Sequence, residues 1–139
     1  MKSQAGFTFT ELLTVVTVMA MLAAVAVPRY AMINSDTRSQ AVRLLAANVK
    51  SSASLSNKVW KATGQPVRLT LDGRNVDMRY GYPTDKSIAE IVVMSSEFEF
   101  ADGYWKHNES GAGQGCAVLY IAPPNPDAEA TVIGYTDGC

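Results

Sequence analysis

The chain has 139 residues, which suits one domain with a modest hydrophobic core. Its 12 basic and 13 acidic side chains nearly cancel, so its overall charge gives no argument for nucleic-acid binding. The two cysteines and the single histidine show no CxxC motif and no clustering, which argues against a zinc site, and we expect no cofactor.

An apolar run of 21 residues, 7–27, follows a hydrophilic stub of six residues that ends Ala5-Gly6. As a helix rising about 1.5 Å per residue, this run would extend about 31 Å, enough to span the hydrocarbon core of a bilayer. Its one charged residue is Glu11. A charged side chain near a bilayer centre costs about 2.5–3.5 kcal/mol on insertion scales, so we expect Glu11 to have a functional role.

The apolar run contains no Lys, Arg or His that could pair with Glu11. Cleavage between Gly6 and Phe7 would create a positive α-amine four residues before Glu11, in this chain and in each neighbouring copy. We therefore predict that Glu11 selects the docking register of subunits, because it stays unpaired until it meets a Phe7 amine.

The Gly6 junction, the motif Phe7-Thr8-Phe9-Thr10-Glu11-Leu12-Leu13 and an apolar helix reaching Pro28 resemble the N-terminus of type IV pilins and pseudopilins. The resemblance implies that an inner-membrane prepilin peptidase cuts after Gly6 and N-methylates Phe7. It also implies that Glu11 pairs with the amine of an adjacent subunit as the filament grows, and that Pro28 bends the helix. Many pilins have a glycine where this chain has Ala20, which leaves open whether the helix melts between Ala20 and Pro28 on assembly.

Two simpler interpretations of the N-terminus stay open. Lys2, the apolar stretch and Ala24-Val25-Ala26 fit a secretory signal cut before Val27, although such a signal has no use for an acid. A plain membrane anchor explains the length of the run and an inward-facing Lys2, but leaves the Gly6-Phe7 junction and the acid unexplained. The first residue of the mature chain distinguishes the three interpretations. Methylated Phe7 would identify a pilin-like chain, Val27 a secreted protein and Met1 a plain anchor.

Beyond Pro28 a helical pattern continues as far as Gly64 and Pro66, which end it. Apolar or small residues recur there at spacings of three and four: Val42, Leu45, Val49, Ala53, Ser56 and Val59 or Trp60. A continuous helix from Phe7 to about Ala62 would be roughly 84 Å long, more than a domain of about 110 residues can bury. We expect the hydrophobic half to protrude, covered by lipid or by other copies, and the amphipathic half to pack on a sheet.

After Pro66 the apolar residues alternate, which predicts strands at residues 67–71 and 76–80, joined by a longer turn at 72–75. Gly81-Tyr82-Pro83 is expected to break this hairpin. A short helix over residues 86–95 should follow, capped by Thr84 or Asp85. Its inward-facing residues are predicted to be Ile88, Ile91 and Val92.

Three more strands are predicted at residues 97–100, with Tyr104 and Trp105 nearby, at 116–122 and at 130–135. An antiparallel sheet packed on the amphipathic helix gives an α+β fold, in agreement with the globular domain that the resemblance to pilins implies. The expected organisation is a cleaved leader at residues 1–6, a membrane and assembly helix at 7–28 and a globular domain at 29–139.

Cys116 and Cys139 form an even pair in a chain that we expect to be exported, which predicts a disulfide closing the loop 116–139. The chain-entropy model assigns this bond about 3.4 kcal/mol of stabilisation. A C-terminal disulfide loop also resembles the D-region of type IV pilins. Within that family, residues 76–83, the helix after them and the cysteine pair look most like the mannose-sensitive haemagglutinin type.

Pseudopilins usually lack this disulfide and often carry a calcium-binding acidic loop instead. Asp127, Glu129 and Asp137 lack the regular spacing of such a loop, so we expect solvated acids and no metal site. His107 lies in a polar stretch, which predicts a surface residue and not a general base. With no catalytic constellation in the spacing, we expect a protein that is not an enzyme.

Aromatic and basic residues occur together in two segments, which suggests either ordinary core packing or a patch for glycans or single-stranded DNA. These residues are Arg79, Tyr80, Tyr82, Tyr104, Trp105 and Lys106.

Together, the residues and the resemblance predict a structural subunit of a type IV pilus. It would be held in the inner membrane as a precursor and then polymerised with itself by the pilus assembly machinery into an extracellular filament for surface attachment. Three alternatives stay open: a pseudopilin of type II secretion acting as a periplasmic piston, a minor pilin that binds glycan or DNA, and an anchored periplasmic enzyme.

Overall fold

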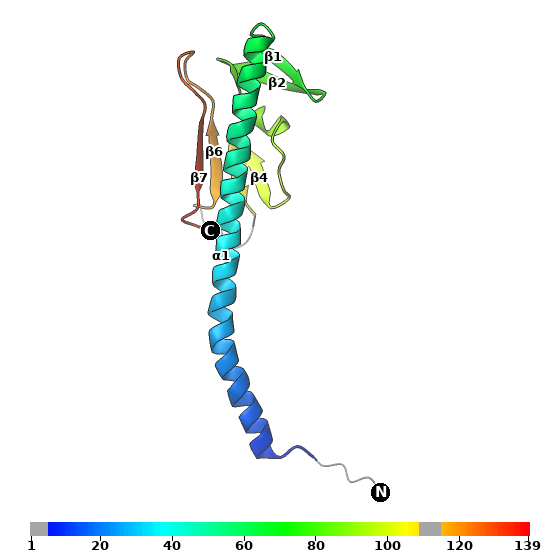
Figure 1. Ribbon diagram of the computed structural model, residues 1–139, viewed down its shortest axis with the longest axis vertical. Coiled ribbons are helices and arrows are strands. Elements are labelled where there is room, and N and C mark those ends of the chain that lie inside the picture. Colours follow the sequence, from blue (N-terminus) through cyan, green and yellow to red (C-terminus); the bar gives the residue numbers. More distant parts are fainter. Residues whose placement is uncertain (1–5, 109–114) are drawn as a thin grey trace. The chain divides into compact units, whose positions relative to one another are not determined.

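The computed structural model describes residues 6–108 and 115–139, without the side chains of residues 30–32. Among these residues, a single long helix, α1 (Phe9–Ala62), comes first and is followed by short strands and one short 3₁₀ helix (Figure 1). The strands are β1 (Arg68–Leu71), β2 (Arg74–Arg79), β3 (Tyr82–Pro83), β4 (Phe98–Ala101), β5 (Tyr104–His107), β6 (Ala117–Ile121) and β7 (Thr131–Tyr135). This is the α+β arrangement that the sequence predicts.

The chain divides into two compact units, Met1–Asp36 and Thr37–Cys139. In the first unit, every side chain from Gly6 to Arg29 is exposed, although most of them are apolar. The hydroxyl of Thr14 donates to the Glu11 carbonyl (2.8 Å) and that of Thr17 to the Thr14 carbonyl (2.8 Å). These polar groups are therefore satisfied within the helix, as a lipid environment requires, and by length and composition α1 can cross a membrane.

In the second unit, α1 presents the apolar face that its periodicity predicts. Val42, Leu45, Val49, Ala53 and Ser56 are all buried, and Val59 and Trp60 are half-buried. The Ser56 hydroxyl donates to the Ser52 carbonyl (2.8 Å), so it enters the core with its hydrogen bond made. The helix ends at Ala62, close to the predicted end at Gly64 and Pro66. Gly64 follows it with a positive φ of 85°, which is typical of a glycine that terminates a helix.

Two antiparallel sheets complete this unit, one of order β1-β2-β3 and one of order β4-β5-β6-β7. In the larger sheet, Trp105 pairs with Val118, which pairs with Gly134. This row faces the helix: a Cβ at Gly134 would lie 3.5 Å from the Ala46 Cβ. The absent side chain allows β7 to approach α1 closely, and the main core forms between the helix and this sheet.

Three two-residue turns connect the hairpins: Asp72-Gly73, Tyr80-Gly81 and Asp102-Gly103. In each, the first residue has φ of 45–51° and the glycine has φ of 76–85°. Positive φ at both positions is the pattern of type I′ turns, whose twist matches that of the flanking strands.

These turns correct three strand predictions. The prediction of a four-residue turn at 72–75 is wrong, because Leu71 already pairs with Arg74 and the turn has two residues. Tyr82 does not break the hairpin but pairs with Arg79 and continues the sheet as β3. The strand β5 was not predicted as a separate strand, because its Asp102-Gly103 turn was not recognised.

The prediction of a helix over residues 86–95 is also wrong. In this stretch a short 3₁₀ helix, η1, covers Ile88–Glu90. Carbonyl groups in this stretch accept side-chain hydrogen bonds in place of helical ones. Arg74 donates to the Glu90 carbonyl (2.6 Å), and Asn48 donates to the Val93 carbonyl (3.1 Å). The inward positions are nevertheless as predicted, with Ile88 and Val92 buried and Ile91 half-buried.

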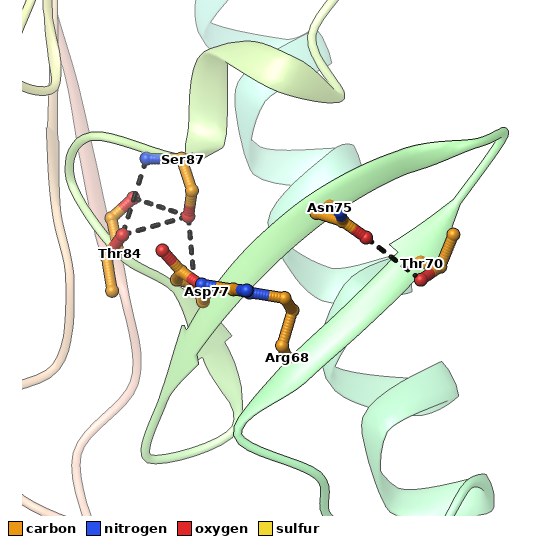
Figure 2. A network of polar contacts seen from close by, with 6 residues as sticks. All are labelled: Arg68, Thr70, Asn75, Asp77, Thr84 and Ser87. Atoms are coloured by element: carbon orange, nitrogen blue, oxygen red, sulfur yellow. Dashed lines mark hydrogen bonds and ion pairs between the residues drawn. The ribbon is translucent and has the colours of Figure 1, made fainter.

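A polar network joins the small sheet to the segment before η1 (Figure 2). The Ser87 hydroxyl donates to the Asp77 carbonyl (2.8 Å) and lies 2.9 Å from the Thr84 hydroxyl. On the hairpin itself, Arg68 pairs with the Asp77 carboxylate at 2.7 Å. Because both groups of this ion pair are more than half exposed, it fixes the register of β1 and β2 more than it adds stability.

His107 is buried, at 3% exposure, so the prediction of a surface residue is wrong. It lies in β5, where alternate residues point inward, and its ring packs edge-on against Phe98 with centroids 5.1 Å apart. The polar residues around it in the sequence point the other way, which is why composition alone placed it at the surface.

Tyr120 links the two sheets, because its buried hydroxyl donates to the Pro83 carbonyl at 2.7 Å. Burial, followed by the nearby Asp85 charge, raises the pKa of the Tyr120 phenol well above its usual range. The folded state therefore keeps a proton that the unfolded chain loses near pH 10, and stability falls as pH rises above that value.

We expect the free energy of unfolding to fall above pH 10 by up to about 1.4 kcal/mol per pH unit from this group. Denaturant titrations of the purified protein between pH 8 and pH 11 measure the slope. Tyr120→Phe should be less stable at pH 7 by roughly 1–3 kcal/mol, because the Pro83 carbonyl loses its donor, but its alkaline slope should be shallower. Equal slopes in both proteins would contradict this account.

Candidate functional site

The candidate site is the segment around Gly6, Phe7 and Glu11, at the start of α1. Gly6, Phe7 and Thr8 precede the helix, which begins at Phe9, and the Phe7 side chain is 79% exposed. The peptide bond between Gly6 and Phe7 is thus accessible and lies outside regular structure, as a proteolytic site requires. A Cβ at Gly6 would meet no atom within 4 Å, so the packing of this chain does not itself demand glycine there.

Thr8 and Glu11 form a capping box at the N-terminus of α1. The Glu11 carboxylate accepts hydrogen bonds from the Thr8 backbone N–H (2.9 Å) and the Thr8 hydroxyl (2.8 Å). In return, the Glu11 backbone N–H contacts the Thr8 hydroxyl oxygen at 3.3 Å, and the Leu12 N–H donates to the Thr8 carbonyl at 3.1 Å. This is the reciprocal pattern of an N-cap threonine with a glutamate three residues later.

The capping box corrects one prediction. Glu11 was expected to stay unpaired until it met a Phe7 amine, but Thr8 already gives its carboxylate two hydrogen bonds. The Thr-x-x-Glu spacing was visible in the sequence and would have identified this contact. Within residues 6–108 and 115–139, however, Glu11 forms no ion pair, so its charge has hydrogen-bond donors but no counter-charge.

Pro28 lies inside α1, and the helix is continuous from Ala20 through Pro28 in the isolated chain. Proline has no N–H, so the carbonyl of Ala24, four residues earlier, receives no helical hydrogen bond at this point. The helix therefore has a local weak point between the apolar run and the amphipathic half, while local melting on assembly stays a prediction.

The C-terminus is fixed by the predicted pair of cysteines. Cys116 and Cys139 form a disulfide with their Cα atoms 4.7 Å apart. The Arg38 guanidinium donates to the Cys139 carbonyl oxygen through Nε (2.9 Å) and Nη2 (2.6 Å). The Gly138 N–H also donates to the Gly115 carbonyl at 3.1 Å. The last residues are thus held against both β6 and α1.

The other predicted site residues lie apart. In the part of the chain that the structure describes, no group of three or more His, Cys, Asp or Glu side chains is placed to hold a metal ion. Asp127 and Glu129 lie on the loop between β6 and β7, whereas Asp137 follows β7. Residues 1–5 of the predicted leader lie outside the described residues.

The aromatic and basic residues do not form one patch. Trp105 is fully buried in the core, and Lys106 points to the opposite face of β5. Tyr82 lies in β3 of the smaller sheet and Tyr80 in the turn before it, and the Arg79 guanidinium donates to the Pro123 carbonyl at 3.5 Å. Core packing accounts for Trp105, whereas Tyr104 and Lys106 line one shallow hollow on the larger sheet, apart from Tyr80 and Tyr82.

Replacing both cysteines with alanine should lower the free energy of unfolding by about 3 kcal/mol, because the unfolded chain regains the entropy of an open loop. Chemical denaturation of the Cys116→Ala/Cys139→Ala variant measures the effect, and the wild-type protein under reducing conditions is the matched control. Unchanged stability in both would show that the Arg38 hydrogen bonds and the sheet hold the terminus without the disulfide.

Comparison with known protein families gives one match. The family model of the prokaryotic N-terminal methylation motif matches residues 1–27. No curated protein and no solved structure matches the chain significantly. The match covers the segment that contains the exposed Gly6-Phe7 bond and the Glu11 capping box, and it says nothing about the domain that follows.

Proposed function

We propose that this chain, whose residues 1–27 carry the methylation signal of type IV prepilins, is a structural subunit of a type IV pilus filament. Prepilin peptidase cuts between Gly6 and Phe7 and methylates the new terminus. The mature chain then leaves the inner membrane and polymerises with other copies into an extracellular filament that serves surface attachment.

Two features together support this proposal. The methylation motif is followed by an apolar helix, and no other segment of the described chain covers the side chains of that helix. From Gly6 to Arg29 every side chain is exposed, including large apolar residues such as Phe9 and Leu22. So much apolar surface is not stable in water, and lipid or other copies of the helix must cover it. A membrane-held precursor that becomes a helical polymer meets this requirement in both of its states.

Glu11 gives the polymer its register. Before docking, the Thr8 amide and hydroxyl both donate to the Oε2 of the carboxylate, which lowers the cost of placing it in lipid without neutralising it. The amine of a neighbouring Phe7 supplies the missing positive charge. A charge-assisted hydrogen bond is about twice as strong as a neutral one, so a subunit gains most when its Glu11 lies level with that amine.

A type II secretion pseudopilin shares this N-terminus and is the second candidate. The Cys116–Cys139 disulfide favours the pilin, because pseudopilins usually lack a C-terminal disulfide. Abundance in surface fractions sheared from cells supports the pilin, whereas retention in the periplasm supports the pseudopilin.

Two substitutions of Glu11 separate its charge from its capping role. Glu11→Gln keeps the ability to complete a capping box, while Glu11→Val removes both functions. We expect both variants to insert and to be processed, but to reduce the filament yield by about ten-fold or more. The physical reason is that losing one member of a buried charge pair costs about 3–5 kcal/mol.

Filament yield is measured by immunoblotting of sheared surface fractions against the total subunit. Normal yield with Glu11→Gln but not with Glu11→Val would show that capping, and not charge pairing, is what assembly needs. Normal yield with both would remove the proposed role of Glu11.

Replacing Gly6 with leucine should block processing and leave an uncut precursor in the membrane. Because no atom of the described residues lies within 4 Å of a Cβ placed at Gly6, we expect the change to leave the described fold unaltered and to act on recognition by the peptidase. Intact-mass analysis and N-terminal sequencing of the purified chain give the outcome, with Ser3→Leu in the same stub as a control that should be cut normally.

In the wild-type chain, the same analysis should find methylated Phe7 as the first residue. A first residue of Val27 or Met1 would instead identify an ordinary secreted protein or a plain anchor.

A further inference from the structure

A hollow of about 540 Å³ lies where the end of α1, the turn between β2 and β3 and the loop between β6 and β7 meet. Figure 1 shows the end of α1 and the β6–β7 loop on the same side of the domain. The volume is within the range of about 300–1,000 Å³ typical of small-molecule sites. Three aromatic residues and two acids dominate its lining: Trp60, Tyr80, Tyr82, Asp127 and Glu129.

The aromatic part of this hollow is held in place by hydrogen bonds. Trp60 donates its indole N–H to the Pro66 carbonyl at 2.8 Å, and Asn57 donates to the Gly81 carbonyl at 2.9 Å. The turn rests directly on the indole, since a Cβ at Gly81 would lie 2.9 Å from the Trp60 ring. With its polar atom already bonded, the Trp60 ring offers the hollow an apolar π surface that needs no rearrangement.

The charge of the hollow is negative. Among the described residues that line it, two are acidic, Asp127 and Glu129, and one is basic, Lys61, which gives a side-chain charge of −1. Both acids are exposed, and in the described part of the chain neither forms an ion pair. Burial and, after it, the Glu129 charge raise the pKa of Tyr82, so its phenol stays neutral at physiological pH.

We propose that this hollow binds a small organic cation that carries an alkylammonium group. Aromatic faces attract such cations through the negative charge of their π systems, and nearby carboxylates add to the attraction. A phosphate-bearing ligand would meet the two carboxylates Asp127 and Glu129 against the single positive charge of Lys61. The sign of the charge is thus opposite to that of the basic aromatic patch that the sequence suggested for DNA.

Choline is a suitable probe because its quaternary ammonium group cannot donate a hydrogen bond and so tests the aromatic and charge attraction directly. The full chain is titrated in a non-ionic polyoxyethylene detergent while tryptophan fluorescence is recorded. Trp60 lines the hollow and Trp105 is fully buried, so a saturable change reports on the hollow.

The neutral isostere 3,3-dimethylbutan-1-ol has the shape of choline without its charge, and sodium chloride controls for ionic strength. We expect a saturable response to choline alone. An equal response to the neutral alcohol, or no saturable response to choline, would overturn the proposal.

Variants of the lining residues test whether choline binds in this hollow. Glu129→Gln and Asp127→Asn should each weaken choline binding about two- to five-fold, and the double variant should weaken it further. Tyr80→Asn removes one ring while keeping a residue that tolerates the positive φ of 51°, and should weaken binding by a similar factor. Glu99→Gln, an exposed acid on β4 outside the hollow, is the matched control and should bind normally.

Unchanged affinity in the Asp127→Asn/Glu129→Gln double variant would overturn the proposal even if choline binds the protein elsewhere. Near-ultraviolet circular dichroism of each variant shows that the fold is kept. The result is independent of filament assembly, since the hollow lies entirely within the unit Thr37–Cys139 of a single chain.

Discussion

The structure depends on one charged group in an apolar segment, the carboxylate of Glu11. An acid at this position is costly in lipid, and Thr8 lowers that cost by donating two hydrogen bonds to the Glu11 Oε2 in a capping box that also starts the helix. The same arrangement leaves the charge itself without a partner within the described residues. In the proposed function, this hydrogen bonding lowers the cost of holding Glu11 in the membrane, and the missing counter-charge gives the polymer its driving force and its register.

The two parts of α1 illustrate how one helix serves two environments. In the unit that ends at Asp36 its apolar side chains are exposed, and its threonine hydroxyls bond to the helix backbone. Beyond Thr37 an apolar stripe packs on the four-stranded sheet, and the charged residues of the helix, such as Arg43, Lys50 and Lys58, are exposed. The methylation motif lies in the first part, whereas the second part forms the core of the domain with the sheets.

The domain is held by contacts that join distant segments. The Tyr120 hydroxyl connects β6 to β3, the Cys116–Cys139 disulfide and Arg38 fix the C-terminus, and side-chain hydrogen bonds replace a helix before β4. Each of these contacts unites residues from different elements. They place the end of α1, the β2–β3 turn and the β6–β7 loop around one negative, aromatic hollow.

The sequence by itself determined the N-terminal methylation motif at residues 1–27, the apolar helix, the inward face of its second half and the α+β class, because these depend on local periodicity, charge and turn chemistry. The position of His107 in the core and the grouping of Trp60 with Asp127 and Glu129 were decided only by the tertiary structure. Strand pairing sets which residues share a face, and loop packing brings together side chains more than sixty positions apart. Neither depends on the neighbours of a residue in the chain, which is why composition placed His107 at the surface.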